Sequence, residues 1–280
     1  MRKIHVYNII SAVAALCIQS NYNLSTDIYS RIETCMNYEK SPVGQDVLNK
    51  ILENASLAYD NQMPICQDTG MAVVFIEIGQ EVCVIGGLLE DAINQGVRQG
   101  YEEGYLRKSV VADPLIRENT GDNTPAVIHY RIVSGDKIKI TVAPKGFGSE
   151  NMSAVKMLKP SDGRKGVIDF VVETVSAAGA NPCPPIVVGV GIGGTMEKAA
   201  WLSKKALLRP INIHHLAEYY QSLEQILLEK INKLGIGPQG FGGSTTALGV
   251  NIETYPTHIA GLPVAVNINC HVTRHATVSV

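Results

Sequence analysis

The first sixty residues carry apolar side chains at helical spacing. In the first segment the apolar positions recur three and four residues apart, at Val6, Ile9, Ile10, Val13, Leu16 and Cys17. This spacing predicts an amphipathic helix. Ser25 or Thr26 could cap a second helix, and the apolar positions between Val47 and Ala58 predict a third. We therefore expect a helical N-terminal segment over residues 1–60.

Beyond residue 60, short apolar runs alternate with helical patterns. Four runs predict strands: Ala72–Ile78, Glu81–Ile85, Ala126–Val133 and Lys137–Val142. The last two flank Ser134-Gly135-Asp136, which predicts that they pair as a hairpin. Helices are expected at 90–108, 149–159, 166–178, 195–208 and 215–233, with a buried strand over 185–189. The order of elements predicts an α/β fold, in which mixed α/β layers over 61–280 follow the helical start, in one continuous domain or in two.

Charge and composition exclude several classes of partner. The 280 residues carry 24 Lys+Arg and 26 Asp+Glu. The chain therefore lacks the surplus of basic residues that would indicate binding to a nucleic acid or an anionic membrane. The uncharged stretch Thr174–Met196 is long enough to test as a membrane span, but Pro182, Pro184 and Pro185 prevent one regular helix there. We expect a cytoplasmic protein with no membrane or nucleic-acid partner.

The six cysteines fall into two groups and are too few and too irregularly spaced for a disulfide scaffold. Three lie within helix or strand patterns and are interpreted as small buried apolar residues: Cys17, Cys35 and Cys83. The other three, Cys66, Cys183 and Cys270, are flanked by Pro, Asn, Gln or Asp, which favour turns. A thiol that must project towards a ligand is expected on such a fixed loop.

Three separated thiols are compatible with several kinds of chemistry. Structural zinc sites usually have paired ligands two to four residues apart, which this sequence lacks. A nucleophilic cysteine needs only one thiol. An iron–sulfur cluster is held by thiolates, and three ligands on a four-iron cluster would leave one iron open as a Lewis acid. Spacing alone does not decide, because the separations match no local ligand pattern.

A family resemblance enters through motifs that follow one another along nearly the whole chain. They are Cys66-Gln67-Asp68-Thr69-Gly70, Tyr105–Ser109, Asn119–Ala126, Lys145–Asn151, Asn181–Pro185 with Gly189–Thr195, and the Cys270 segment that ends in Arg274-His275. In these segments the chain resembles the α subunit of class I, iron–sulfur-dependent fumarate hydratases and of the related L(+)-tartrate dehydratases. The resemblance implies loops that converge on a [4Fe-4S] cluster bound by Cys66, Cys183 and Cys270, with the fourth iron reserved for substrate.

The resemblance also implies roles for individual residues. Asp68 and His258 match the family's catalytic positions, and Asp68 would protonate or orient the departing hydroxyl. The matching substrate-binding positions are Gln67, Arg107, Gly146, Gly148 and Ser149. Arg107 would anchor one substrate carboxylate, and the glycine loop would offer backbone N–H groups.

The expected reaction is the reversible hydration of fumarate to malate, a step of the tricarboxylic acid cycle. L(+)-tartrate dehydration is the alternative. Single-chain members of the family continue into a C-terminal domain with further substrate-binding residues, whereas this sequence ends at Val280. We therefore expect a separate β subunit that completes the active site, in an α2β2 assembly.

Two other functions compete with this interpretation. Gly189-Val190-Gly191-Ile192-Gly193-Gly194 matches the dinucleotide-binding glycine pattern between a strand and a helix. The second strand that should end in an acidic residue is missing, because Arg209–His215 reads Arg-Pro-Ile-Asn-Ile-His-His. A non-catalytic subunit that only assembles iron and sulfur is the other alternative.

Overall fold

The computed structural model describes residues 1–280 and confirms the α/β fold. The chain forms two compact units, each assembled from segments that are distant in sequence. Unit 1 comprises Met1–Leu24, Asn54–Phe147 and Arg274–Val280, and unit 2 comprises Ser25–Glu53 and Gly148–Thr273. A division of the chain near residue 60 stays a prediction. No helix combines the length and the apolar character that crossing a bilayer would require.

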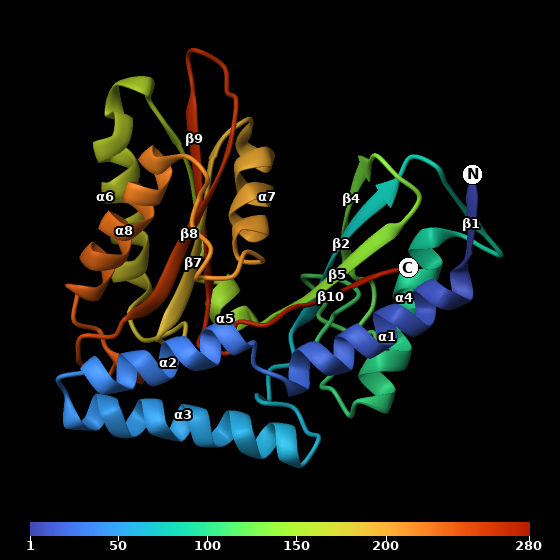
Figure 1. The fold of residues 1–280 in the computed structure, drawn as a ribbon, viewed down its shortest axis with the longest axis horizontal. Coiled ribbons are helices and arrows are strands. Elements are labelled where there is room, and N and C mark those ends of the chain that lie inside the picture. Colours follow the sequence, from blue (N-terminus) through green and yellow to red (C-terminus); the bar gives the residue numbers. More distant parts are fainter. The chain divides into compact units, whose positions relative to one another are not determined.

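Unit 1 is built on a four-stranded sheet with the order β10-β5-β2-β4, beside a parallel pair of β1 and β3. Its elements are β1 (Arg2–His5), α1 (Val6–Tyr22), β2 (Met71–Gly79), β3 (Val82–Ile85), α4 (Leu89–Glu103), β4 (Val127–Val133), β5 (Ile138–Lys145) and β10 (Ala276–Ser279). Helices α1 and α4 cross closely (Figure 1). A Cβ at Gly96 or Gly100 of α4 would lie 2.7 Å from a carbonyl oxygen of α1. These glycines therefore set how closely the two helices approach.

The expected hairpin of 126–133 and 137–142 is wrong in its pairing, although both segments are strands. β2 lies between them, parallel to β4 and antiparallel to β5. The physical reason is burial. The middle of β2, from Ala72 to Ile76, is buried, whereas β4 exposes Tyr130 and Ile132. The most apolar strand takes a central position in the sheet, and β4 takes an edge.

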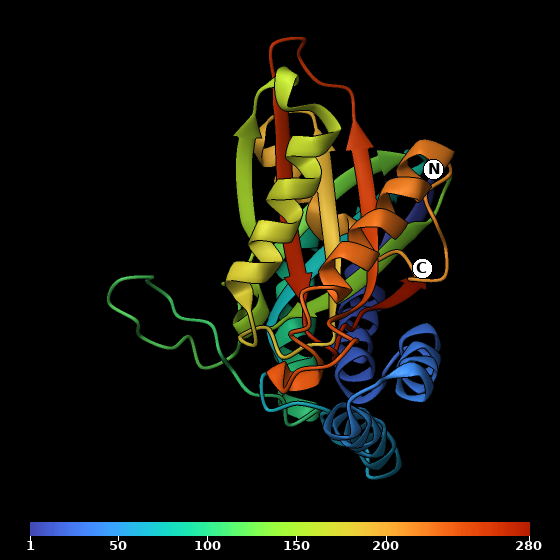
Figure 2. The same ribbon diagram turned by 90° about the vertical axis from the view of Figure 1, so that its left-hand side faces the viewer.

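Unit 2 is built on a second four-stranded sheet with the order β6-β9-β7-β8. Its elements are α2 (Thr26–Tyr38), β6 (Ala154–Leu158), α6 (Gly163–Ala178), β7 (Ile186–Gly193), α7 (Met196–Ala206), α8 (Glu218–Asn232), β8 (Ala247–Tyr255) and β9 (Leu262–Asn269), with most of α3 (Pro42–Asp60) and α5 (Phe147–Glu150). Helix α7 covers one face of the sheet, and α6 and α8 cover the other (Figure 1). Figure 2 displays the strand order from olive-green β6 to orange β8.

Strand β7 is buried along its whole length. A Cβ at Gly189 would lie 2.1 Å from the Ser203 carbonyl oxygen, and one at Gly191 would lie 2.1 Å from that of Ala199. Both contacts are with α7, so these glycines admit a helix against the sheet. The glycine pattern that resembles a dinucleotide-binding loop is thus largely part of a buried strand.

The expected helix over 149–159 is wrong. The structure has the short helix α5 followed by β6, which pairs antiparallel with β9. Met152, Val155 and Leu158 are three residues apart, which imitates helical periodicity. Val155 and Met157 are exposed in the edge strand β6. Pairing with a strand more than a hundred residues away overrides the local pattern.

Glu39, just after α2, is a buried anchor within unit 2. Its side-chain oxygens accept hydrogen bonds from the backbone N–H groups of Lys40, Ser41, Ser244 and Thr245, at 2.8–3.0 Å. Burial acts to raise the pKa of this carboxyl, but the bonds from Ser244, Thr245 and Ser41 together lower it to about 2. The ionised carboxylate therefore ties the end of α2 to the loop that precedes β8.

We predict that Glu39→Gln lowers the free energy of unfolding at pH 7 by about 3 kcal/mol, because an amide offers these donors only one oxygen. The carboxyl's pKa is lower in the folded protein than its ordinary value of 4.5. Its stabilisation is therefore complete above pH 4.5 and is lost as the pH falls towards 2. Urea unfolding of wild type and variant from pH 7 to 3.5 should show that the difference between their free energies of unfolding becomes smaller as the pH falls.

Glu53→Gln is the matched control, because Glu53 is an exposed helical residue paired only with Lys50 and Asn49. Its substitution should leave the free energy of unfolding almost unchanged at any pH, because exposed ion pairs contribute little to stability. If the loss in the free energy of unfolding caused by Glu39→Gln stayed constant with pH, the stabilising role of the ionised Glu39 carboxylate would be contradicted.

Candidate active site

Cys66 lies in the loop between α3 and β2, within unit 1. The preceding residue anchors this loop, because the Ile65 side chain is buried and its N–H donates to the Asn21 carbonyl at 3.0 Å. Asn54 Nδ2 donates to the Ile65 carbonyl at 2.9 Å. The Cys66 thiol is partly exposed and donates to Oε1 of the exposed Gln67 at 3.4 Å. The thiol therefore projects from a fixed, irregular segment, as its neighbours predicted.

Asp68 joins this loop to the segment after β5. Its Oδ1 accepts from the Gly70 N–H, and its Oδ2 accepts from the Phe147 N–H, both at 3.0 Å. A Cβ at Gly146 would lie 3.1 Å from Oδ2, so glycine permits this close approach. The Asp68 N–H also contacts Cys66 Sγ at 3.4 Å. Unit 1 thus brings Cys66, Asp68 and Gly146 together.

Arg274 lies against the same turn. Its side chain is only 5% exposed, and Nη2 donates to the Asp68 carbonyl. Its Nε and Nη1 are buried without a hydrogen-bond partner. Buried donors of a guanidinium normally have acceptors, so this arginine is poised to receive one. The sequence alone does not show whether the Arg274 side chain is buried in this way or exposed to solvent.

The turn after Asp68 also fixes the segment that carries Arg107. Thr69 Oγ1 donates to the Arg107 carbonyl at 3.0 Å. The buried Tyr101 hydroxyl lies 2.8 Å from the Thr69 carbonyl and 3.0 Å from that of Gly70. Burial raises the pKa of Tyr101, which keeps its hydroxyl protonated as a donor. The Arg107 side chain is exposed. Its backbone is therefore held beside the Asp68 turn, with its guanidinium accessible.

Cys183 and Cys270 lie at the same end of the unit 2 sheet. Cys183 precedes β7 and Cys270 follows β9, and these strands pair antiparallel with Val187 opposite Asn269. The two loops also touch, because His271 donates its N–H to the Cys183 carbonyl at 3.4 Å and its Nδ1 lies 3.0 Å from the same oxygen. Cys183 has a φ of 53°, a left-handed conformation that a non-glycine residue rarely adopts.

Gln239 is a residue that sequence reasoning missed. Its N–H and its Nε2 both donate to the Pro184 carbonyl, at 2.7 and 2.9 Å. Nε2 also lies 3.1 Å from His271 Nδ1. Gln239 has a left-handed φ of 51°. It therefore clamps the backbone beside Cys183 and contacts the residue after Cys270. The glycine-rich segment around it is visible in the sequence, but nothing in the sequence reveals this contact.

Gly148 and Ser149 belong to unit 2, at the short helix α5. A Cβ at Gly148 would lie 3.7 Å from the Asn181 carbonyl oxygen, which places this glycine beside the Cys183 loop. Ser149 is buried, and its carbonyl accepts from the Met152 N–H at 3.1 Å. The structure therefore places Gly148 beside the loop that carries Cys183 and Ser149 inside the unit.

His258 is not brought to the other predicted residues of unit 2. It is exposed on the turn between β8 and β9, where its Nδ1 accepts from the Ala260 N–H at 3.2 Å. Cys270 follows the other end of β9, a strand of eight residues. At about 3.3 Å per residue the two ends are about 26 Å apart. Within this chain, His258 lies at the opposite end of the sheet from Cys183 and Cys270.

The predicted ligands are thus divided between the units. Cys66 lies in unit 1, and Cys183 and Cys270 lie in unit 2. Within neither unit are three His, Cys, Asp or Glu side chains grouped to hold a metal ion. Each unit therefore carries part of the predicted cluster site on loops that hydrogen bonds hold in place.

Comparison with known proteins identifies the family. A family model described as "Fumarate hydratase (Fumerase)" matches residues 10–279. The chain belongs to this family. The prediction of a hydro-lyase from the fumarate hydratase and tartrate dehydratase family is confirmed.

Curated relatives cover nearly the same length. "Putative L(+)-tartrate dehydratase subunit alpha" of Methanocaldococcus jannaschii is 46% identical over 260 residues, which is 90% of this chain and 90% of the relative. "L(+)-tartrate dehydratase subunit alpha" of Escherichia coli strain K12 is 34% identical over 271 residues, which is 96% of this chain and 89% of the relative. The likeness therefore extends over both units.

We predict that Gln239→Ala lowers the free energy of unfolding by about 2 kcal/mol, because the Pro184 carbonyl and the His271 ring both lose the contact with Nε2. Gln239→Gly should recover about 1 kcal/mol of this loss, because glycine accepts the left-handed φ at this position. Urea unfolding measures both values. Hydrogen exchange at the Asn181 and Cys183 amides should be faster in both variants.

Gln99→Ala is the control, because this half-buried glutamine bonds only to Glu103 on its own helix. It should change stability by less than about 0.5 kcal/mol. Equal stability of Gln239→Ala and wild type would contradict the clamp.

Proposed function

We propose that the chain is the α subunit of an iron–sulfur hydro-lyase that hydrates fumarate to malate together with a separate β subunit. The match to the family model over residues 10–279 is the observation that carries this proposal. Both relatives described above carry names that end in "subunit alpha". The same names favour a second candidate reaction, the dehydration of L(+)-tartrate.

A [4Fe-4S] cluster is proposed on Cys66, Cys183 and Cys270, and the donor chemistry fits. All three are cysteines on loops fixed by backbone hydrogen bonds rather than in regular elements. Thiolates are the ligands that such clusters prefer. The left-handed φ of Cys183 supports a functional position, because such strain is retained where a site requires it. When bound, the cluster would supply Lewis-acid chemistry towards the departing hydroxyl.

The chain's own residues are proposed to position the substrate and move a proton. Asp68 uses one lone pair on each oxygen for the Gly70 and Phe147 N–H groups, which leaves others for a substrate hydroxyl. Arg107 is proposed to bind one carboxylate through its planar guanidinium, which would fix the carbon that faces the base. The exposed Gln67 beside Cys66 is proposed as a further polar contact. Gly146 and Gly148 keep the adjoining backbone free of side chains.

We predict that Asp68→Asn lowers turnover by about 10²-fold or more with the iron content unchanged, because an amide cannot exchange the proton. Steady-state kinetics and iron analysis of the complete enzyme measure these two quantities. Asp113→Asn is the control, because Asp113 makes a similar turn with the Leu115 and Ile116 N–H groups and is not a predicted site residue. Loss of iron from Asp68→Asn would show that Asp68 acts in cluster binding instead.

The complete enzyme is proposed to be an α2β2 assembly. Anaerobic co-expression with a β subunit should yield a brown protein that bleaches in air and hydrates fumarate, whereas either chain alone should be inactive. Fumarate, malate and L(+)-tartrate should be compared as substrates. Faster turnover of tartrate would favour the second candidate reaction, and a colourless, inactive assembly would refute the proposal.

In such an assembly, His258 could serve only the site of a second copy, because the whole length of β9, about 26 Å, separates it from Cys270. The co-expression experiment tests this with mixed α chains. Chains with His258→Asn should complement chains with Cys270→Ser, because one site of the hybrid would then combine intact residues. No activity in the mixture would contradict the supply of His258 by a second copy, and full activity of chains that all carry His258→Asn would remove His258 from the proposed site.

A further inference from the structure

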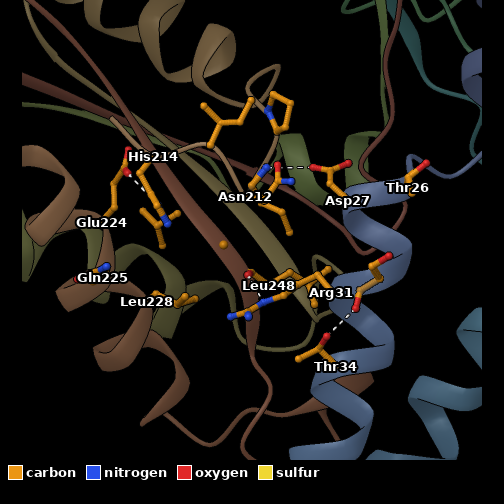
Figure 3. A pocket seen from close by; sticks show the side chains of 16 residues that line it. Thr26, Asp27, Arg31, Thr34, Asn212, His214, Glu224, Gln225, Leu228 and Leu248 are labelled. Carbon is orange, nitrogen blue, oxygen red and sulfur yellow. Dashed lines mark hydrogen bonds and ion pairs between the residues drawn. The ribbon is translucent and has the colours of Figure 1, made fainter. Parts of the chain in front are cut away.

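Unit 2 contains a cavity of about 750 Å³ that no predicted site residue lines. Four elements line it: α2, the turn 210–214, α8 and the edge of β8 (Figure 3). Much of its wall is apolar and consists of Pro210, Ile211, Ile213, Leu228, Leu248 and Val250. Both the volume and the apolar lining are typical of small-molecule sites.

The edge of β8 lines this cavity, and side chains cap most of its outward backbone groups. Asn232 bonds to both the N–H and the C=O of Ala247, and Arg31 donates to the C=O of Leu248. At Ile252, the N–H donates to Glu224 and the C=O accepts from Arg209. Capping of this kind prevents an edge strand from pairing with another chain.

Val250 is the exception on this edge. Backbone groups of a strand face alternate sides, so the N–H and C=O of Val250 point the same way as those of Ile252, away from β7. No side chain or other element bonds to them, although the residue is only 5% exposed. Buried backbone groups without partners are rare in folded proteins. The cavity therefore presents one uncapped donor and one uncapped acceptor.

The cavity also holds an arginine that forms no ion pair, in a lining that includes the carboxylates of Asp27 and Glu224. Arg31 extends from α2 into the cavity (Figure 3), where its Nε donates to the Leu248 carbonyl at 3.1 Å. The two carboxylates of the lining are engaged elsewhere. Asp27 accepts from the Ile211 N–H at 3.0 Å, and Glu224 pairs with Arg209. Arg31 forms no ion pair, so both of its terminal nitrogens remain available for an anion.

We propose that this cavity binds an apolar carboxylate that carries an amide, the chemistry of an N-acylated amino acid or of a peptide C-terminus. The carboxylate would receive the terminal nitrogens of Arg31 as a planar fork. The amide would both donate to and accept from Val250, as an added strand residue does. The side chain would fill the apolar wall. This site is independent of the proposed cluster and of the hydro-lyase reaction.

N-acetyl-L-leucine is the probe, titrated into the full chain by calorimetry. We expect saturable binding of one molecule per chain. N-acetyl-leucinamide lacks the carboxylate, and the N-methylated acid lacks the amide donor. Each should bind at least tenfold more weakly, which corresponds to about 1.4 kcal/mol. Because these comparisons use the wild-type chain, they do not depend on whether a variant folds.

Arg31→Met should weaken the binding of N-acetyl-L-leucine at least tenfold. Arg31→Lys should retain part of the binding, because lysine keeps the positive charge but lacks the planar pair of terminal nitrogens. Arg164→Met is the control, because Arg164 lies on α6 over the Tyr219 ring and outside the cavity lining. Its binding should equal that of wild type.

The acetylated tripeptide acid Ala-Ala-Leu distinguishes the two sources. Tenfold tighter binding than N-acetyl-L-leucine would assign the site to a peptide C-terminus, and equal or weaker binding would assign it to a small acid. Absence of saturable binding at about 10 mM, equal binding of the leucinamide, or unchanged binding by Arg31→Met would overturn the proposal.

Discussion

The antiparallel pairing of β7 with β9 is the constraint on which the arrangement of unit 2 depends. Because these strands run in opposite directions, the segment that enters β7 and the segment that leaves β9 meet at one end of the sheet. That end carries Cys183 and Cys270. The register is fixed from both sides, since β7 is buried along its whole length and Gly189 and Gly191 admit α7 directly onto its backbone. A sheet packed this tightly transmits its geometry to the loops at its ends.

Polar side chains then hold the loops, in addition to the buried Ile65 side chain beside Cys66. Asp68 accepts two backbone N–H groups in unit 1, and Glu39 accepts several in unit 2. Gln239 works in the opposite sense and donates twice to one carbonyl. Each of these contacts fixes a backbone group. The backbone of the neighbouring Cys66 or Cys183 is therefore held in place independently of the contacts of the cysteine side chain. Directed hydrogen bonds of this kind give loops a precision that burial alone cannot supply.

The sequence identified the elements more successfully than their partners. Helical periodicity over 1–60 and apolar runs over 72–78 and 126–133 each depend on local spacing, and the structure has helices and strands there. The hairpin failed because the pairing of β4 depends on which strand is most apolar, a comparison that no single window contains. Gln239 was missed for a similar reason, since its left-handed φ and its contact with Pro184 follow from a loop that tertiary contacts close.

His258 illustrates what family resemblance and geometry each contribute. Resemblance assigns this histidine to the active site, because it assigns residue types to positions in a sequence. The sheet separates it from Cys270 by the whole length of β9, and a hydrogen-bonded strand cannot shorten to bring its ends together. A local movement of the turn therefore does not remove the separation. If the residue acts in catalysis, the acting copy must come from another molecule. The fold then decides which chain supplies a residue whose identity the family had already indicated.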